Sequence, residues 1–353
     1  MTCVHLYFIL IEIMDSLTQI VLGAACGEAV LGKKIGNKAL LFGAIGGTVP
    51  DLDVYVGNLL YGNAIDAMLF HRGFMHSVLF SVVGAFGFGW LAHKFYNSGR
   101  RLNTTTQKDW IWMCFLALFT HIVLDCFTPY GTQMFVPFSE SRIAFNNIAV
   151  VDPVYTLPFL VCTIVLMFFK RNSNRRGVWL KLGVGISTVY MVLTLCNKLY
   201  VNFIFKQSLI ENNIPFSRYS TQPAIFNNVL WYGIAETDTT YAMANYSLLD
   251  TKNRFLDFKY LPKQRAIQVA RYKDLKRLVK FSNGYYSIYK VGEKTYQYND
   301  YRYPLLDSND PNSSVFSLQL FEENNRFNMK PFEPKFDNFK VIMLKLWQRI
   351  KGI

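Results

Sequence analysis

Residues 71–95 read HRGFMHSVLFSVVGAFGFGWLAHKF, a short polar stretch with two histidines followed by a long apolar one. From Phe74 to Phe95 this stretch is long enough to cross the hydrocarbon core of a bilayer, which takes about 20 residues. The sequence therefore predicts a membrane helix that begins beside a group of titratable side chains. We therefore expect a polar site at one end of a bundle of membrane helices, and the rest of the sequence can support or oppose this prediction.

The composition of the whole chain is that of a membrane protein. Hydrophobic residues make up 51% of the 353 residues and charged ones 17%, whereas soluble domains carry about 25% charged residues. The net charge of +13 does not indicate nucleic-acid binding, because many basic residues lie in short loops between apolar runs, where they set membrane orientation. The six cysteines form no CxxC pair, so we expect neither disulfides nor a cysteine zinc site.

Six apolar segments precede residue 206, at about 17–31, 39–49, 74–95, 110–127, 151–169 and 178–205. The last four have the length of transmembrane helices. The first two are short for full spans but rich in glycine and alanine, and small residues allow two helices to pack closely as a hairpin. We predict a mainly α, polytopic helical bundle with four to six membrane helices.

The first 13 residues are apolar, but they lack the basic start and the small-residue cleavage site of a signal peptide. The run Met14-Asp15-Ser16 is typical of a new start followed by a helix cap. We therefore expect residues 1–13 to be an upstream extension, with the first helix beginning near Ser16.

Basic residues are concentrated in three alternate loops, 32–38, 94–108 and 170–176. The positive-inside rule places such loops in the cytoplasm. The intervening loops, 50–73 and 128–150, then face outward, together with everything after about residue 206. This pattern predicts a multi-pass protein of the inner (cytoplasmic) membrane with its C-terminal region on the outer side.

The chain becomes polar and rich in Asn and Tyr after residue 205. Five segments mix aromatic and β-branched residues between turn-forming ones, as strands do: 228–235, 240–249, 285–291, 295–303 and 315–321. A helix is expected at about 265–281. The predicted organisation is a transmembrane domain over 14–205, an extramembrane α+β domain over 206–335, and a basic amphipathic helix over 336–353. That last helix could lie on a membrane surface or pack on the domain.

Histidine and aspartate residues from several loops gather at the predicted outer face. They are Asp51 and Asp53 after the second segment, His71 and His76 around the start of the third, His121 and Asp125 near the end of the fourth, and Asp152 before the fifth. Such side chains are expensive near lipid and normally face a protein interior with partners. His121 and Asp125 are four residues apart, so one helical face presents both.

Carboxylates and imidazoles together suit Zn²⁺, Mn²⁺ or Fe²⁺ better than Ca²⁺, and we favour zinc. The predicted ligands are Asp51, Asp53, His71, His76, His121 and Asp125. Asp152 is either a further ligand or a helix cap. Asp53 or His76 would act as a general base. Arg72 would hold a phosphate or carboxylate of the substrate, or else anchor to lipid headgroups.

These motifs resemble the YdjM-type membrane-bound metal-dependent hydrolases. The family pattern is MDxxTH, PDxD, HRGxTHS and HxxxDxxTxxG with a following PFS, and its counterparts here are Met14–Gln19, Pro50–Asp53, His71–Ser77, His121–Gly131 and Pro137–Ser139. Gln19 stands where many members have His, and Met75 replaces the usual Thr. The resemblance implies a hydrolase with a metal site in these motifs, but Gln19 is left out of the ligand set because glutamine is a poor ligand.

The function predicted from the sequence is a membrane-embedded metal-dependent hydrolase, with a phosphoester or lipid-like substrate at the outer face and membrane lipid as partner. One alternative is a metal or ion transporter, and another is a non-catalytic membrane assembly protein. A transporter needs polar residues that continue toward the cytoplasmic halves of the helices. Those halves look apolar in the sequence, which favours the enzyme.

Overall fold

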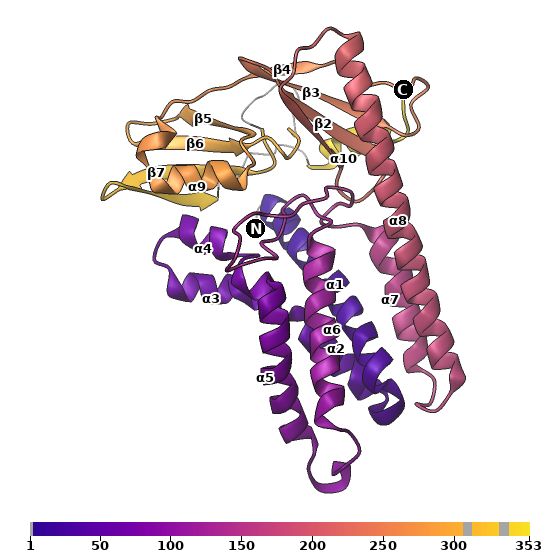
Figure 1. The fold of residues 1–353 in the computed structure, drawn as a ribbon. Coiled ribbons are helices and arrows are strands. Elements are labelled where there is room, and N and C mark those ends of the chain that lie inside the picture. The colour runs from indigo at the N-terminus through magenta and orange to yellow at the C-terminus, as the bar shows by residue number, and fades with distance from the viewer. Residues whose placement is uncertain (1–2, 306–312, 332–338) are drawn as a thin grey trace.

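The computed structural model of the protein describes residues 3–305, 313–331 and 339–353. Within these ranges the chain forms a helical N-terminal bundle and, beyond one end of the bundle, a region with two four-stranded antiparallel sheets (Figure 1). The bundle contains α1 (Cys3–Ile35), α2 (Asn37–Thr48), α3 (Asp53–Leu60), α4 (Ala64–Phe70), α5 (Val78–Tyr96), α6 (Gln107–Asp125), α7 (Pro153–Met167) and α8 (Asn174–Glu211).

Two helices of the described chain, α5 and α8, are long and apolar enough to cross a membrane. A third span results if α2 and the Pro50–Leu60 helices are counted as one element bent by 42°. The segments predicted at 110–127 and 151–169 are also helical, as α6 and α7, although α7 has only 15 residues. The helical membrane region is confirmed, with two or three candidate spans.

Two predicted helix ends are wrong. Helix α1 runs without a break from Cys3, so Ser16 lies inside it and does not begin it. The residues before Ser16 contain neither Gly nor Pro, so nothing in the backbone chemistry interrupts the helix there. Helix α8 continues to Glu211, beyond the predicted end at 205. Its 38 residues span about 57 Å, nearly twice the thickness of a bilayer core.

Helices α1 and α2 form the close-packed hairpin that their small residues predict. A Cβ atom placed on Gly43 would lie 2.2 Å from the carbonyl oxygen of Gly23, and one on Gly47 would lie 2.6 Å from that of Gln19. Real side chains do not tolerate such distances, so only glycine allows the two backbones to approach this closely. The hairpin therefore fixes the position of Gln19 and of the Gly47 carbonyl group beside the bundle end that faces the sheets.

Each sheet is an antiparallel meander. The first contains β1 (Arg218–Pro223), β2 (Leu230–Glu236), β3 (Thr240–Ser247) and β4 (Lys259–Pro262), and the second β5 (Tyr286–Lys290), β6 (Thr295–Asp300), β7 (Ser317–Glu323) and β8 (Arg326–Pro331). All five predicted strands are confirmed. The sequence did not predict β1, β4 and β8, which are short or polar. The predicted helix at 265–281 is shorter than expected, because α9 covers only Lys273–Phe281.

Both sheets pack on the bundle. The C-terminal end of α8 places Phe205 and Leu209 in the core of the first sheet, against Trp231. Helix α4 places Ile65 and Leu69 in the core of the second sheet and α9. The carboxylate of Asp66 adds an ion pair with Arg326 at 2.9 Å and one with Arg277. The bundle end that carries α3 and α4 is therefore fastened to the sheets.

The predicted C-terminal amphipathic helix is present as α10 (Phe339–Ile350). It is tied to the first sheet through Arg349, whose Nη1 and Nη2 donate to the carboxylate of Asp250 at 2.7 and 2.8 Å. Leu344 and Trp347 on the same helix remain exposed. The helix therefore packs on the domain through one face and leaves apolar side chains on another.

Candidate metal centre

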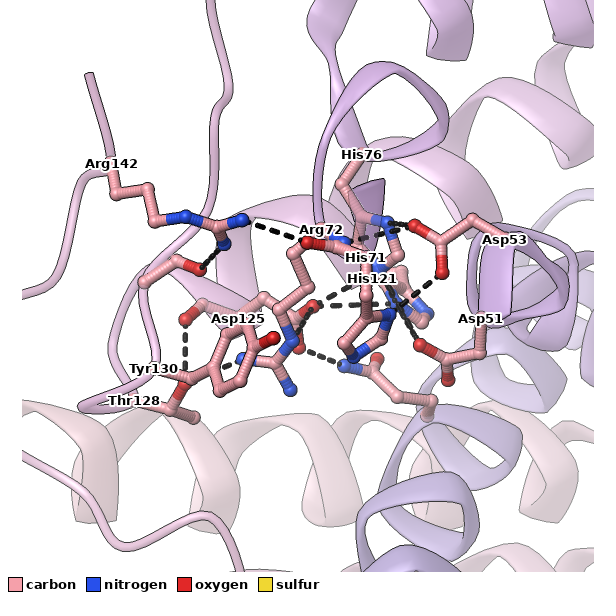
Figure 2. A network of polar contacts seen from close by, with 12 residues as sticks. Asp51, Asp53, His71, Arg72, His76, His121, Asp125, Thr128, Tyr130 and Arg142 are labelled. Atoms are coloured by element: carbon pink, nitrogen blue, oxygen red, sulfur yellow. Dashed lines mark hydrogen bonds and ion pairs between the residues drawn. The ribbon is translucent and has the colours of Figure 1, made fainter. Parts of the chain in front are cut away.

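Four side chains from three separate segments meet at the bundle end nearest the sheets (Figure 2). Asp51 comes from the 3₁₀ turn Pro50–Leu52 that follows α2, and His76 from the 3₁₀ turn Phe74–His76 that precedes α5. His121 and Asp125 lie on the last turn of α6. One ligand atom from each of the four lies within 4.8 Å of all the others. This group could hold a metal ion.

Five distances between the four ligand atoms are close to the edges of a tetrahedral metal site. The two Nε2 atoms of His76 and His121 are 3.2 Å apart. Each lies 3.4 Å from Asp51 Oδ1, and they lie 3.3 and 3.5 Å from Asp125 Oδ2. Zinc–nitrogen and zinc–oxygen bonds of about 2.0–2.1 Å give ligand–ligand distances of about 3.3–3.4 Å in a tetrahedron. These five distances therefore match those expected between ligands of one divalent ion.

The chemistry of the two imidazoles also fits a cation. His121 Nδ1 lies 2.6 Å from the carbonyl oxygen of Gly47, which can only accept, so this nitrogen carries the proton. His76 Nδ1 lies 2.9 Å from Asp53 Oδ2, the natural acceptor for a proton on that nitrogen. Both Nε2 lone pairs then point at the same small volume. Two lone pairs 3.2 Å apart repel each other unless a proton or a metal ion lies between them.

Asp53 and His71, which the sequence predicted as ligands, lie outside this group of four. Asp53 is fully buried and accepts from His71 Nδ1 at 2.7 Å, while its other oxygen faces His76. Outer carboxylates of this kind fix the orientation and tautomer of a ligand histidine. Burial lowers the pKa of His71, whereas the pKa of His76 is raised because its three carboxylate partners outweigh burial.

The turn that carries the two histidines has an unusual backbone. Arg72 lies in the left-handed region with φ of 57°, which is unfavourable for a residue with a side chain. Its N–H donates to Asp53 Oδ2 at 2.9 Å, and its carbonyl accepts from Gln133 N at 3.0 Å. These bonds hold the conformation that lets His71 and His76 share one carboxylate. Ser77 then caps α5 by accepting from Phe80 N.

Arg72 does not face an open space where a substrate could reach it. Its side chain is 3% exposed, with Nε 3.1 Å from Asp125 Oδ2 and Nη1 donating to Thr128 Oγ1 at 2.8 Å. The guanidinium also lies over the ring of Tyr130, 5.1 Å from its centroid. The predicted contact between Arg72 and a substrate is therefore replaced by an ion pair that positions a ligand of the centre.

Gln19 is a site residue that the sequence prediction left out. Its Nε2 donates to Asp125 Oδ1 at 2.8 Å, and the residue is 1% exposed. It therefore contacts a ligand of the centre and is not itself one of the four converging groups. Its place at the end of the MDxxTH motif was the signal available in the sequence. Asp152, the lesser candidate, caps α7 through Val154 N and accepts from Tyr190.

The four converging side chains differ in exposure. The side chains of His76, His121 and Asp125 are 0–1% exposed, whereas that of Asp51 is 25% exposed. His71, in the layer behind His76, is 23% exposed. Among the four converging residues, Asp51 is therefore the one that water or a substrate could contact first.

The fold and the site define the class: a helical membrane protein with a buried Asp/His cluster that could hold a metal. The model of the YdjM inner membrane protein family matches residues 14–201, and the chain belongs to this family. It is similar to the uncharacterized protein YfhP of Bacillus subtilis (strain 168), with 29% identity over 187 residues. That stretch covers 51% of this chain and 51% of YfhP, so about half of each protein is compared. No solved structure matches the chain.

Proposed function

We propose that this protein is a membrane-embedded, metal-dependent hydrolase whose ion is held by Asp51, His76, His121 and Asp125. The convergence of two imidazole nitrogens and two carboxylate oxygens within 4.8 Å of one another is the observation that carries this proposal. Zn²⁺ suits such a set best, and Mn²⁺ or Fe²⁺ are the alternatives. A divalent ion supplies Lewis-acid polarisation of a phosphoryl or carbonyl oxygen and makes water more acidic.

A hydrolytic centre also needs a position for water or substrate. Zinc held by all four residues would be a closed site, so Asp51 would have to leave room for water or substrate. Asp51 is the exposed ligand and lies on a short turn, which makes its side the entry. The other three ligands are buried and fixed by Asp53, Gly47, Gln19 and Arg72.

The general base that the geometry favours is His71, a residue that the sequence predicted as a ligand. Its Nδ1 is held by Asp53, so Nε2 remains for a proton from water. Asp53 is then a positioning residue and not the base, because it is fully buried and contacts His71, His76 and the backbone of Arg72. Arg72 likewise acts through Asp125.

The substrate that we propose is a phosphoester or a lipid-like molecule at the membrane interface, since a site at the end of a membrane bundle meets amphiphiles first. We place this end on the outer side of the inner membrane, in a bundle of four to six membrane helices. The basic loops lie together at the opposite end: Lys34 pairs with Asp109 at 2.6 Å, and Arg171 donates to the carbonyl oxygen of Lys34.

The proposal is tested by assaying purified full-length protein against a panel of phosphoesters and lipids. We expect hydrolysis that a chelator abolishes and that one metal ion restores. His121→Ala should lose at least 10³-fold in kcat/KM, since it removes a ligand of the ion. His93→Ala, on the distant end of α5, is the matched control and should retain activity. Full activity in chelated protein, or in His121→Ala, would overturn the proposal.

One observation favours the transporter alternative. The cytoplasmic halves of the helices are not entirely apolar, because Arg176 makes a two-point ion pair with Glu28 at 2.8 and 2.6 Å, and both are buried. Polar pairs inside a membrane bundle occur along ion pathways as well as in structural locks. Uptake of metal into proteoliposomes, lost in both His121→Ala and Glu28→Gln, would assign transport in place of hydrolysis.

A further inference from the structure

A cleft of about 630 Å³ lies between the membrane bundle on one side and α9 and β1 on the other, and none of the four converging residues lines it. The bundle contributes Phe70, Gly73 and Tyr130 to its wall, and the C-terminal region contributes Phe281 and Arg302. Small-molecule sites have volumes of about 300–1,000 Å³ and often occur between domains. The size and position of the cleft are therefore those of a ligand site.

Four basic side chains line the cleft, and three of them are balanced by a carboxylate. Arg277 pairs with Asp66, Lys280 with Glu140, and Arg302 with Asp300. Arg142 is different, because no carboxylate of the described residues lies within ion-pair distance of its guanidinium. Its three hydrogen bonds all go to backbone carbonyl oxygens, those of Gly131, Leu69 and His71.

These bonds use three of the five N–H groups that a guanidinium carries. The guanidinium of Arg142 also packs against the rings of Tyr130 and Phe281, whose centroids lie 5.2 and 5.3 Å from its central carbon. The guanidinium of Arg302 lies over the same Phe281 ring at 4.7 Å. Two like charges share one ring, and an anion bound beside them would offset their repulsion.

The cleft is bordered by apolar side chains on its bundle side. Phe74 and Tyr61 line it and are 43% and 41% exposed. Helix α3, which ends just before Tyr61, exposes Leu59 and Leu60 at 86% and 63%. Apolar side chains exposed together on a membrane protein favour contact with acyl chains or with lipid.

We infer that this cleft binds an anionic amphiphile, with its phosphate or carboxylate on Arg142 and its apolar part along Phe74, Tyr61 and the end of α3. Arg142 also donates to the carbonyl oxygen of His71, and it shares the Tyr130 ring with Arg72. An anion bound to Arg142 would therefore be separated from the candidate metal centre by His71 and Arg72. The inference concerns binding alone, so it stands or falls independently of hydrolysis.

Binding is measured with full-length protein in neutral detergent after treatment with a chelator, which separates this test from any metal chemistry. Fluorescent phosphatidylglycerol is titrated against the protein, with phosphatidylcholine of the same chain length as the neutral comparison. Soluble glycerol phosphate is added as competitor. We expect phosphatidylglycerol to bind at least tenfold more tightly than phosphatidylcholine, and glycerol phosphate to compete only weakly.

Arg142→Gln should weaken phosphatidylglycerol binding by about tenfold, the loss of one charge-assisted hydrogen bond. Arg142 also donates to three backbone carbonyl oxygens, so its replacement could disturb the fold. Lys280→Glu on the exposed face of α9 is therefore the second variant, and we expect it to weaken phosphatidylglycerol binding by about threefold. Lys276→Glu is its matched control, since Lys276 is exposed on the same helix but does not line the cleft, and it should bind as the unmodified protein does.

Equal affinity for the two lipids would overturn the inference, as would unchanged binding in both Arg142→Gln and Lys280→Glu. Competition by glycerol phosphate as strong as that of phosphatidylglycerol would assign the cleft to a soluble phosphate compound, against the amphiphile proposed here.

Discussion

Asp53 contacts three groups of the 71–76 turn, the imidazoles of His71 and His76 and the backbone N–H of Arg72. It is fully buried, so its charge is stabilised only by these contacts. One carboxylate thereby orients a ligand of the proposed ion and the proposed general base together. At the scale of single residues, the centre depends on this carboxylate as much as on its ligands.

Asp53→Asn should lower metal affinity by about 10–100-fold, the usual cost of losing a carboxylate behind a ligand histidine. The amide can still accept one hydrogen bond, but it no longer favours the required tautomers of both imidazoles. Competition with a chelator of known affinity measures the change. Asp66→Asn is the control, because the carboxylate of Asp66 pairs with Arg277 and Arg326 and is not one of the converging groups. Equal affinity of Asp53→Asn and the unmodified protein would contradict this role.

Gln19→Ala should weaken metal binding by several-fold, because Asp125 Oδ1 loses the hydrogen bond that orients it. The same competition assay measures the loss. Gln133→Ala is a suitable control, since its amide donates to the carbonyl oxygen of Glu140 and does not contact the ligands. A variant at Gln19 with undiminished affinity would show that Arg72 alone positions Asp125.

All four converging residues were among the six ligands predicted from the sequence, because acids and histidines near lipid need polar partners and these were the candidates at one face. Their separation from Asp53 and His71 was not predictable. The separation depends on the left-handed backbone conformation of Arg72, which lies between His71 and the ligand His76. No residue pattern in the sequence predicts that conformation. Burial of Arg72 was missed for the same reason.

At the scale of elements, the close packing of α1 on α2 through their glycines brings one backbone group and one side chain to the candidate metal centre. The Gly47 carbonyl oxygen accepts from His121, and Gln19 on α1 reaches Asp125. Both depend on the distance between the helices, which the glycines set. Packing within the hairpin is therefore coupled to the geometry of the ligands.

Gly43→Ala should lower the free energy of unfolding by about 1–3 kcal/mol, because its Cβ would lie 2.2 Å from a backbone oxygen of Gly23 and the helices must separate. Thermal unfolding in detergent checks this, with metal affinity as a second readout. Gly87→Ala on α5 is the matched control, since nothing lies within 4 Å of a Cβ there. Equal melting temperatures for the two variants would contradict the close approach.

Apolar length and small-residue patterns predicted most helices, and aromatic and β-branched residues between turn-forming residues predicted five strands. The remaining elements form through tertiary contacts. Strand β4, Lys259–Pro262, is four residues long and is defined by its pairing with β3. The extension of α8 to Glu211 follows from burial of Phe205 and Leu209 against the first sheet, which no local pattern shows.

At the scale of the whole molecule, both sheets lie beyond one end of the bundle, and the loops between α5 and α6 and between α7 and α8 lie at the other end (Figure 1). The candidate metal centre is at the end nearest the sheets, because His76 follows α4, which packs on α9. The positive-inside rule then predicts that the candidate metal centre faces the outer side of the membrane. In a background without Cys3 and Cys196, Glu293→Cys should react with a membrane-impermeant maleimide on intact cells. Asn103→Cys should react only after the membrane is opened. The reverse pattern would place the centre on the cytoplasmic side.

The most direct measurement is the position of a metal in the molecule itself, by anomalous diffraction from crystals of the full chain purified without added chelator. We predict one peak, about 2.0–2.2 Å from the ligand atoms of His76, His121 and Asp125 and beside Asp51. A crystal with no anomalous peak there at the zinc, iron and manganese edges, while the four side chains are ordered, would contradict the account.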